Sequence, residues 1–127
     1  MKDLVKRYYP VKGGEEERDG HKSRRVVKVY LDYQLGGVNW ANGQREPRGY
    51  YAHVVPVSLE DYGDGMVMET CVAFSGGKWI LVECARQSPK KEAEARKLFE
   101  ERYRDLVGQL MKDSPDLPNV DFDHPEK

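Results

Sequence analysis

The chain has almost no excess of charge of either sign: 21 Lys and Arg residues stand against 22 Asp and Glu residues, a net charge of −1. Proteins that bind mainly phosphate groups usually carry a basic surplus, so this balance argues against nucleic-acid binding without excluding it. Long hydrophobic runs are also missing. No stretch approaches the roughly 20 apolar residues of a membrane helix, and the start MKDLVKRYYP has no apolar segment of signal-peptide length. We therefore expect a cytoplasmic protein without membrane contact.

Histidine and cysteine, which most often build metal and nucleophile sites, are scarce. The three histidines, His21, His53 and His124, are scattered without metal-ligand spacing. Cys71 and Cys84 fall in apolar stretches, where a buried thiol is usually inert. The glycine pairs lack the spacing and the following helix of a phosphate loop. The sequence therefore predicts a protein that is not an enzyme and has no catalytic residues, metal or cofactor.

Whether Cys71 and Cys84 can pair depends on the hairpin in which the sequence places them. A turn at Gly76-Gly77 puts them on one face but in diagonal positions, whereas a turn at Gly77-Lys78 puts them directly opposite each other. A disulfide needs Cα atoms within roughly 7 Å of each other. Because cytoplasmic proteins keep their thiols reduced, we expect two free cysteines that face the core.

The length of 127 residues suits a single domain with one core. Residues 1–25 are expected to be a flexible N-terminal arm and linker, because the segment from Lys12 to Arg25 has no apolar side chain that could pack. Residues 26–112 form the predicted α+β domain. Residues 113–127 are rich in Pro and Asp, and we expect them to form a loose C-terminal tail.

The domain contains four runs with strand character, at residues 26–33, 50–57, 66–74 and 79–85. The first alternates apolar and polar residues, as a half-buried strand does. The second should end or bulge at Pro56, which lacks the amide donor that a ladder needs. The last two flank Gly76-Gly77, a pair typical of a two-residue hairpin turn. The sequence therefore predicts that these two runs pair with each other.

After Gln87 the apolar period changes from two to 3.6, which predicts a helix that continues to about Lys112. Ser88 is a good N-cap, and Pro89 fits the first turn, where its missing amide costs nothing. Ser114-Pro115 ends the pattern. The apolar stripe of this helix consists of Ala95, Leu98, Phe99, Tyr103, Leu106 and Leu110.

The fold class that follows is α+β, with a four-stranded antiparallel meander and one long C-terminal helix packed on one face. In the Gly-Gly register both faces of the last hairpin are apolar, with Phe74 and Trp79 on one face and Ile80 and Cys84 on the other. One helix covers one face. The N-terminal arm, a second copy of the chain or a partner must then cover the other.

The segment from Gln34 to Tyr51 is a long, turn-rich connection of the kind that is usually functional or disordered. It is rich in residue types found at interface hot spots. The predicted contact residues for a protein or a nucleic acid are Trp40, Asn42, Arg45, Arg48, Tyr50 and Tyr51, and the secondary ones are Phe74, Trp79, Lys90 and Lys91. A structural alternative stays open, in which Trp40 folds back onto the sheet as a lid and the arginines pair with Glu46 or Asp32.

The segment KWILVECARQSPKKEAEARKLFEERYRDL runs from a strand into a helix whose start contains Ser88, Lys90, Lys91, Glu92 and Ala93. In this it resembles the ends of double-stranded-RNA-binding domains and of the three-stranded DNA-binding domains of tyrosine recombinases. The resemblance implies nucleic-acid contacts through the helix start and the 34–51 loop. The chain departs from the first family because no helix precedes its sheet, and from the second because the face opposite the helix is not basic and polar.

The stretches LGGVNWANGQREPRGYY, FSGGKW and RQSPKKEAE are similar to small uncharacterised proteins carried by bacterial mobile elements. This resemblance spans residues 26–110 and implies no activity, only a setting in which small proteins bind host or element-encoded macromolecules. Together with the missing catalytic residues, it favours a non-enzymatic module that binds a protein partner or a second copy of itself as a homodimer. Nucleic-acid binding is the alternative.

Overall fold

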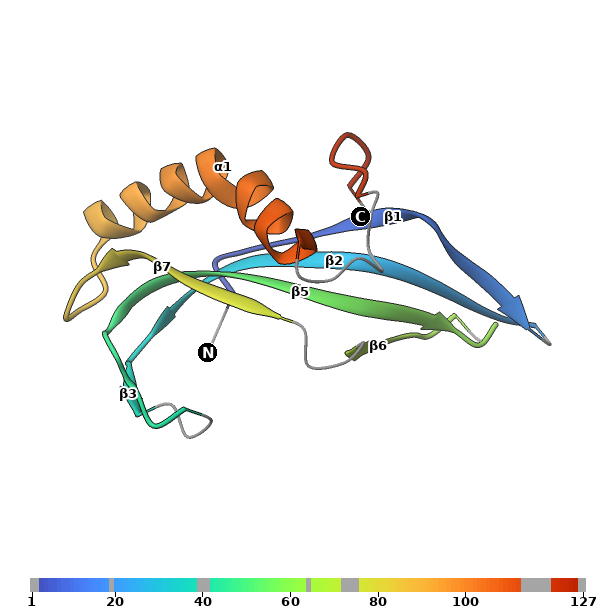
Figure 1. The fold of residues 1–127 in the computed structure, drawn as a ribbon, viewed down its shortest axis with the longest axis horizontal. Helices are drawn as coiled ribbons and strands as arrows, with labels where there is room; N and C mark the ends of the chain where they lie inside the picture. Colours follow the sequence, from blue (N-terminus) through green and yellow to red (C-terminus); the bar gives the residue numbers. More distant parts are fainter. Residues whose placement is uncertain are drawn as a thin grey trace.

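The computed structural model describes residues 3–18, 20–38, 42–63, 65–71, 76–112 and 120–125. An antiparallel sheet carries one long C-terminal helix on one of its faces (Figure 1), which confirms the predicted α+β class. The helix lies over one end and the middle of the sheet, and the other end extends beyond it. We call that end, formed by residues 12–18, 20–25, 58–63 and 65–71, the projecting end.

Strands β1 (Val5–Arg18) and β2 (His21–Gln34) form a long antiparallel ribbon, in which Val5 lies opposite Leu31. Most of the segment that was predicted to be a flexible arm and linker, residues 1–25, is therefore strand in its described part. No apolar side chain is needed there, because the backbone ladder and cross-strand pairs of opposite charge hold the ribbon together. The register places Glu15 opposite Arg24 and Glu17 opposite Lys22.

Strand β5 (Gly49–Asp61) is the centre of the sheet and pairs with β2 along one edge. Along its other edge it pairs with two strands, β7 (Gly77–Glu83) beside residues 49–54 and β6 (Val67–Cys71) beside residues 57–61. The sheet thus has five strands, and the predicted four-stranded meander is wrong. The predicted hairpin between the last two runs is also wrong, because both strands pair with β5.

Pro56 lies where the outer edge of β5 changes partner. On that edge, the described pairs end with Val54 opposite Gly77 and resume with Val57 opposite Cys71. Residues 72–75 lie outside the described residues, so the predicted loss of pairing on one side of Pro56 stays a prediction. The predicted end of the strand at Pro56 is wrong, because β5 continues to Asp61 in its ladder with β2.

This arrangement separates the two cysteines. Cys71 lies opposite Val57, whereas the backbone amide of Cys84 donates to the carbonyl of Arg48 at 3.0 Å. These positions on the β5 side are nine residues apart, or about 30 Å at the usual rise of a strand, so a disulfide between the cysteines is excluded. Cys84 is free and half-buried against the core, as predicted.

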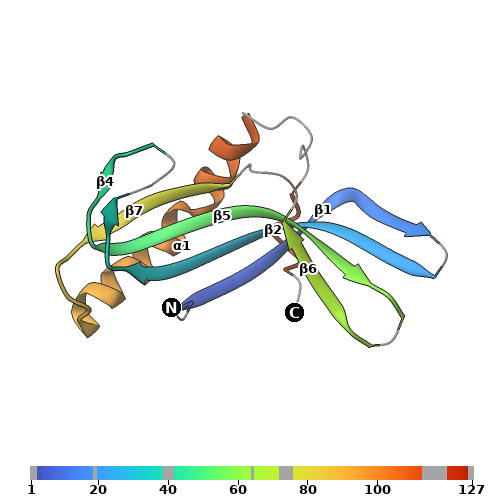
Figure 2. The ribbon, with the colours of Figure 1, turned by 90° about the horizontal axis from the view of Figure 1, so that it is seen from below.

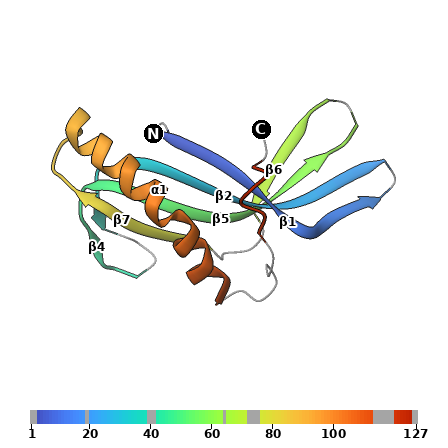
Figure 3. The same ribbon diagram turned by 90° about the horizontal axis from the view of Figure 1, so that it is seen from above.

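Helix α1 (Pro89–Lys112) begins and ends where the sequence predicts. The side-chain oxygen of Ser88 accepts a hydrogen bond from the amide of Lys91 at 3.1 Å, which is the expected N-cap. The helix runs obliquely across the strands and packs on β7, β5 and β2 (Figure 3). Among the described residues, no helix has both the length and the apolar character needed to cross a membrane.

The core lies between α1 and the sheet. It contains the predicted helix residues Ala95, Phe99, Tyr103 and Leu106, with Val107 in addition, while Leu98 and Leu110 pack at its margin. The sheet contributes side chains from β1, β2, β5 and β7: Tyr9, Val11, Val27, Val29, Leu31, Tyr33, Tyr50, Ala52, Val54 and Val82. Alternate residues of each strand point to this face, which explains why the period-2 pattern was readable in β2.

Residues 120–125 are fastened to the outer edge of β1. Val120 forms a bridge with Val11, and the amide of Asp121 donates to the carbonyl of Pro10 at 2.8 Å. The ring of Phe122 lies edge-on to Tyr9, with 5.3 Å between their centroids. The expectation of a loose tail is therefore wrong for these residues, because an aromatic contact and backbone hydrogen bonds hold them in place.

Candidate binding surfaces

The sheet face opposite α1 carries polar and aromatic side chains over its inner part, where the sequence predicted an apolar surface. Tyr30 lies opposite His53, and His53 lies opposite Lys78, so the three share this face. The rings of Tyr30 and His53 stack at 4.2 Å, and Lys28 lies 5.0 Å above the Tyr30 ring. The apolar prediction fails because it rested on a β6–β7 hairpin that does not form.

A buried, hydrogen-bonded pair of Asp32 and His53 lies at the centre of this face. His53 Nε2 is 2.7 Å from Asp32 Oδ1, and both residues are less than one-tenth exposed. Burial by itself raises the pKa of Asp32, but the hydrogen bond and charge of His53, with help from Gln34 and Lys78, outweigh it and lower the pKa below its usual value. Asp32 is therefore ionised at neutral pH, and His53 Nε2 donates the hydrogen bond.

An aspartate–histidine pair can serve as a general base when a nucleophile or substrate proton is within reach. In the described part of the chain, His53 Nε2 donates to Asp32, and no hydroxyl or thiol is a hydrogen-bond partner of His53. No group of three or more metal-ligating side chains occurs among the described residues. We therefore interpret the pair as a structural hydrogen bond that links β2 and β5 in the interior of the sheet.

Strands β3 (Gly37–Val38) and β4 (Arg45–Glu46) form a small separate ribbon that lies on the β7 side of the sheet (Figure 2). We call residues 35–38 and 42–48 the flap. Lys78 of β7 holds the flap to the sheet by an ion pair with Glu46, and the same ammonium group donates to Gln34 Oε1 of β2 at 3.1 Å. At the return of the chain, Gly49 has a φ of +159°, and an added Cβ would lie 2.2 Å from the carbonyl oxygen of Val82.

Three of the predicted contact residues, Asn42, Arg45 and Arg48, lie on the flap and are exposed. Asn42 Oδ1 accepts a hydrogen bond from the amide of Gln44 at 2.9 Å and so shapes a turn. Trp40 lies outside the described residues, as does Phe74. The flap offers the three polar side chains to solvent, and their role in binding stays a prediction.

The two tyrosines of the predicted loop surface belong to the fold. Tyr50 is 0% exposed, and its hydroxyl lies 3.4 Å from the carbonyl of Ser88 beneath α1. Tyr51 is 4% exposed, and its hydroxyl donates to the carbonyl of Pro47 at 2.6 Å. Neither ring is available to a partner, so the prediction of these two as contact residues is corrected. Residues on both faces of β5 are buried, which a strand pattern does not reveal.

The predicted secondary residues fall on different surfaces. Trp79 is half-buried on the helix side, where its ring lies over Gly77 and an added Cβ there would be 2.1 Å from it. Lys90 and Lys91 are exposed on the first turn of α1, and Lys91 Nζ lies 3.8 Å from Glu94. The structure therefore does not bring Trp79 onto one surface with the two lysines.

Among the described residues, the largest group of exposed apolar side chains lies at the projecting end, near the start of β6. Tyr62 is 54% exposed, Met66 66%, Val67 53% and Met68 56%. The sequence analysis did not name these four residues as contacts, because it placed the run from Met66 in a hairpin with the run 79–85 and sought its uncovered face at Phe74 and Trp79. The available signal was that one helix cannot cover four strand runs.

A polar cluster supports this end of the sheet. His21 Nε2 is 2.6 Å from Glu60 Oε2, and Ser58 donates to Glu60 Oε1 at 2.8 Å. The hydrogen bond from Ser58 and that from His21 lower the pKa of Glu60 against the effect of burial. The Tyr62 ring stacks on His21 with 4.3 Å between centroids. The exposed ring of Tyr62 therefore has a fixed support.

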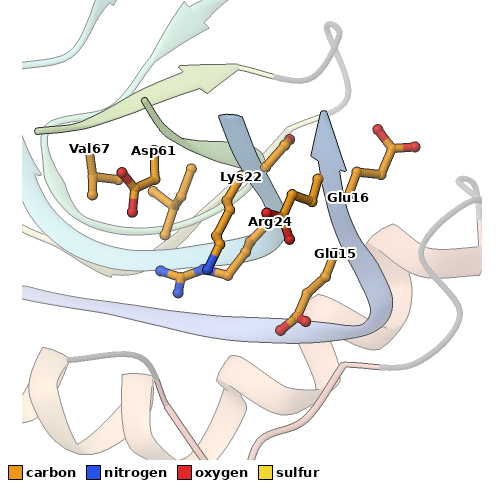
Figure 4. Close-up of a pocket in the computed structure, with 9 residues that line it drawn as sticks. Glu15, Glu16, Lys22, Arg24, Asp61 and Val67 are labelled. Atoms are coloured by element: carbon orange, nitrogen blue, oxygen red, sulfur yellow. The ribbon is translucent and has the colours of Figure 1, made fainter. Parts of the chain in front are cut away.

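A groove of about 440 Å³ lies under the projecting end (Figure 4). Lys22 and Arg24 reach in the same direction from β2, with Asp61 and Val67 to one side of them. The residues that line the groove are Glu15, Glu16, Glu17, Lys22, Ser23, Arg24, Leu59, Asp61 and Val67. Because the lining mixes both signs of charge, the groove is not specific for an anion such as a phosphate.

The two edges of the sheet at this end differ in how open they are. On the β1 edge, the register shifts between Pro10 and Glu15, Gly13 has a φ of +80°, and residues 15–17 are all glutamates. Bulges and charges of this kind prevent further strand pairing. Strand β6 is exposed from Val67 to Thr70 and, in the described part of the chain, pairs only with β5. The β6 edge is the open one.

Comparison of the chain with protein-family models, with curated proteins and with solved structures gives no match. The resemblances to nucleic-acid-binding domains and to mobile-element proteins therefore stay predictions from the sequence.

Proposed function

We propose that the protein is a non-enzymatic module that binds another protein chain through the projecting end of its sheet. The observation that carries this proposal is the position of Val67 and Met68, each more than half exposed on an open edge strand. An edge strand offers unpaired amides and carbonyls, and exposed apolar side chains next to it add contact area. Both features are used when a protein adds a strand to a sheet edge.

The supports of this surface agree with a binding role. Tyr62 rests on His21, and His21 is held by Glu60, so the ring does not need to be ordered when a partner arrives. Methionine is a flexible and polarisable side chain that adapts to partner surfaces, which suits Met66 and Met68. The likeness to mobile-element proteins points in the same direction, since it implies binding rather than catalysis.

Nucleic-acid binding is the second candidate, and the exposed Arg45, Arg48, Lys90 and Lys91 favour it. The flap and the first turn of α1 both lie toward the end of the sheet where β5 begins (Figures 1 and 2). Acidic neighbours reduce the attraction, because Glu92 pairs with Arg96 and Glu94 with Lys91. This second mode would use the end of the molecule opposite the projecting end.

A photo-crosslinking residue placed at Met68 tests the first proposal against the second. The full-length chain carrying it is irradiated in the cells that naturally produce it, and the adducts are separated by protease and nuclease treatment. We expect a protein adduct at position 68 and none from a matched variant with the crosslinker at Lys97, which is exposed on α1. An absence of protein adducts at position 68, or nuclease-sensitive adducts at Arg45 instead, would contradict the proposal.

A further inference from the structure

We propose that the chain bound at the β6 edge is a second copy of this protein, whose β6 pairs antiparallel with the first. The inference rests on the proposed function and names its partner. The sheets of the two copies would become continuous through β6 of each copy, and a two-fold axis perpendicular to the sheet would relate them.

The edge strands differ in ways that favour pairing of β6 with β6 of the second copy over pairing of β6 with β1 or β7 of the second copy. The β1 edge has a bulge, three glutamates and the bridge from Val120 to Val11. Strand β7 is irregular opposite Tyr50 and Tyr51 and has α1 packed on it. A β6-to-β1 contact would also repeat without end, whereas a contact of β6 with itself closes after two copies.

Charge selects the register of the pair. A two-fold axis perpendicular to the sheet keeps each face of the sheet on the same side, so one residue of β6 must lie opposite its own counterpart. An axis at Glu69 would put two carboxylates directly opposite each other, which is unfavourable. An axis at Met68 avoids this contact, because it puts Met68 opposite Met68 of the second copy and Val67 opposite Glu69.

The contacts of Glu69 within its own chain fit this register. Its carboxylate accepts a hydrogen bond from the Tyr8 hydroxyl at 2.6 Å and one from Lys28 Nζ at 3.1 Å. Burial raises the pKa of Glu69, but these two donors outweigh burial and lower it. The charge is therefore bound to its own sheet, and Glu69 can lie opposite Val67 of the second copy without a new partner.

The size of the contact predicts a weak dimer. Stable interfaces bury roughly 800 Å² on each partner, and one five-residue strand with the methionines and Tyr62 provides less than that. We expect dissociation in the micromolar range and therefore a mixture of monomer and dimer at ordinary concentrations. This weakness makes a covalent trap the sharper test.

The trap is the full-length Met68→Cys protein, with Cys71→Ser to remove the neighbouring thiol, under mild oxidation. Residues directly opposite in a ladder have Cα atoms about 5 Å apart, so the new thiols should form a disulfide-linked dimer. Thr70→Cys on the same strand and face is the matched control. Position 70 of the second copy would lie about 13 Å away along the strand, so the Thr70→Cys protein should not form a disulfide-linked dimer by itself. A mixture of the Thr70→Cys and Met66→Cys proteins should form one, because positions 70 and 66 lie opposite each other.

Sedimentation provides the reversible measurement. Met68→Glu places two carboxylates opposite each other and should raise the dissociation constant about tenfold or more, whereas Lys97→Glu on α1 should not change it. A chain that is monomeric at millimolar concentration, or that links at position 70 as fast as at 68, would overturn the inference. If a different protein still forms an adduct at position 68 in cells, only the self-pairing fails. If no protein adduct forms there, the proposed function fails too.

Discussion

The half of the sheet beneath α1 and the projecting end are built from the same strands but are held together in different ways. Under the helix, β2 and β5 bury Val29, Leu31 and Val54 against Phe99. At the projecting end the same two strands carry Arg24, Ser58 and Glu60, and polar contacts replace the apolar layer. Because burial of apolar area is the main source of folding free energy, stability should be concentrated under the helix.

The projecting end is available for binding because its exposed apolar side chains contribute little to the stability of the fold. A surface that contributes little to stability can present apolar groups and an open edge. Substitutions should therefore reduce the free energy of unfolding most in the half of the sheet under α1 and least at the projecting end.

The largest expected effect is at Phe99, which is 0% exposed in the middle of the core. Phe99→Ala should reduce the free energy of unfolding by about 3–5 kcal/mol, through lost burial and a residual cavity. Denaturant titration measures it. Glu101→Ala, an exposed site on the same helix, is the control and should stay near wild type. A loss below about 1 kcal/mol for Phe99→Ala would show that α1 is not the second layer of the core.

Asp32→Ala should have the next largest effect, about 1–3 kcal/mol, because it leaves buried His53 without its acceptor. The exposed Asp105→Ala on α1 is the matched control. Thermal melts of the two variants at neutral pH compare them directly. Equal melting temperatures would mean that the Asp32–His53 pair contributes no net stability.

Acid should reduce the stability of the fold by protonating three hydrogen-bonded carboxylates. The folded-state pKa values of Asp32, Glu60 and Glu69 lie below their ordinary values of 3.8 and 4.5. The unfolded chain therefore binds protons first as pH falls, so this stability is present above about pH 4.5 and is lost as pH falls through the folded values. Unfolding free energies from pH 7 to 3 should decrease, and less steeply in Asp32→Asn. Equal slopes for both proteins would contradict the assignment.

Tyr51→Phe tests the attachment of the flap. The variant loses the 2.6 Å hydrogen bond to the carbonyl of Pro47 and should cost about 1 kcal/mol. Arg45→Ala and Arg48→Ala, both exposed on the flap, should each change stability by less than about 0.5 kcal/mol. The same melts measure all three. A larger loss for either arginine would place it within the fold and favour the structural alternative for the 34–51 loop.

The smallest effect on stability is expected at the projecting end. Met68→Ser removes an exposed apolar side chain and should change the free energy of unfolding by less than about 0.5 kcal/mol. Its association, measured by sedimentation, should weaken nonetheless. A Met68→Ser protein that loses stability like a core variant would remove the distinction between the two halves of the sheet.

The sequence determined the elements whose physics is local. Helix α1 starts at Pro89 because the Ser88 side chain caps its amides, and its apolar face repeats every 3.6 residues. The inner part of β2 was readable from its alternation of apolar and polar residues. These features depend on residues a few positions apart, which a sequence displays directly.

Only the tertiary structure decided which strands pair and which surfaces stay open. Gly76-Gly77 has the local signal of a turn, but Gly77 pairs with Val54, because β5 is long enough to take β7 and β6 end to end. The charged residues 12–18 and 21–25 became strand because the ladder, not an apolar face, holds them. Tyr50 became core and Met68 surface because a single helix covers only part of a long sheet. Pairing and coverage depend on residues distant in the chain, so local pattern could not fix them.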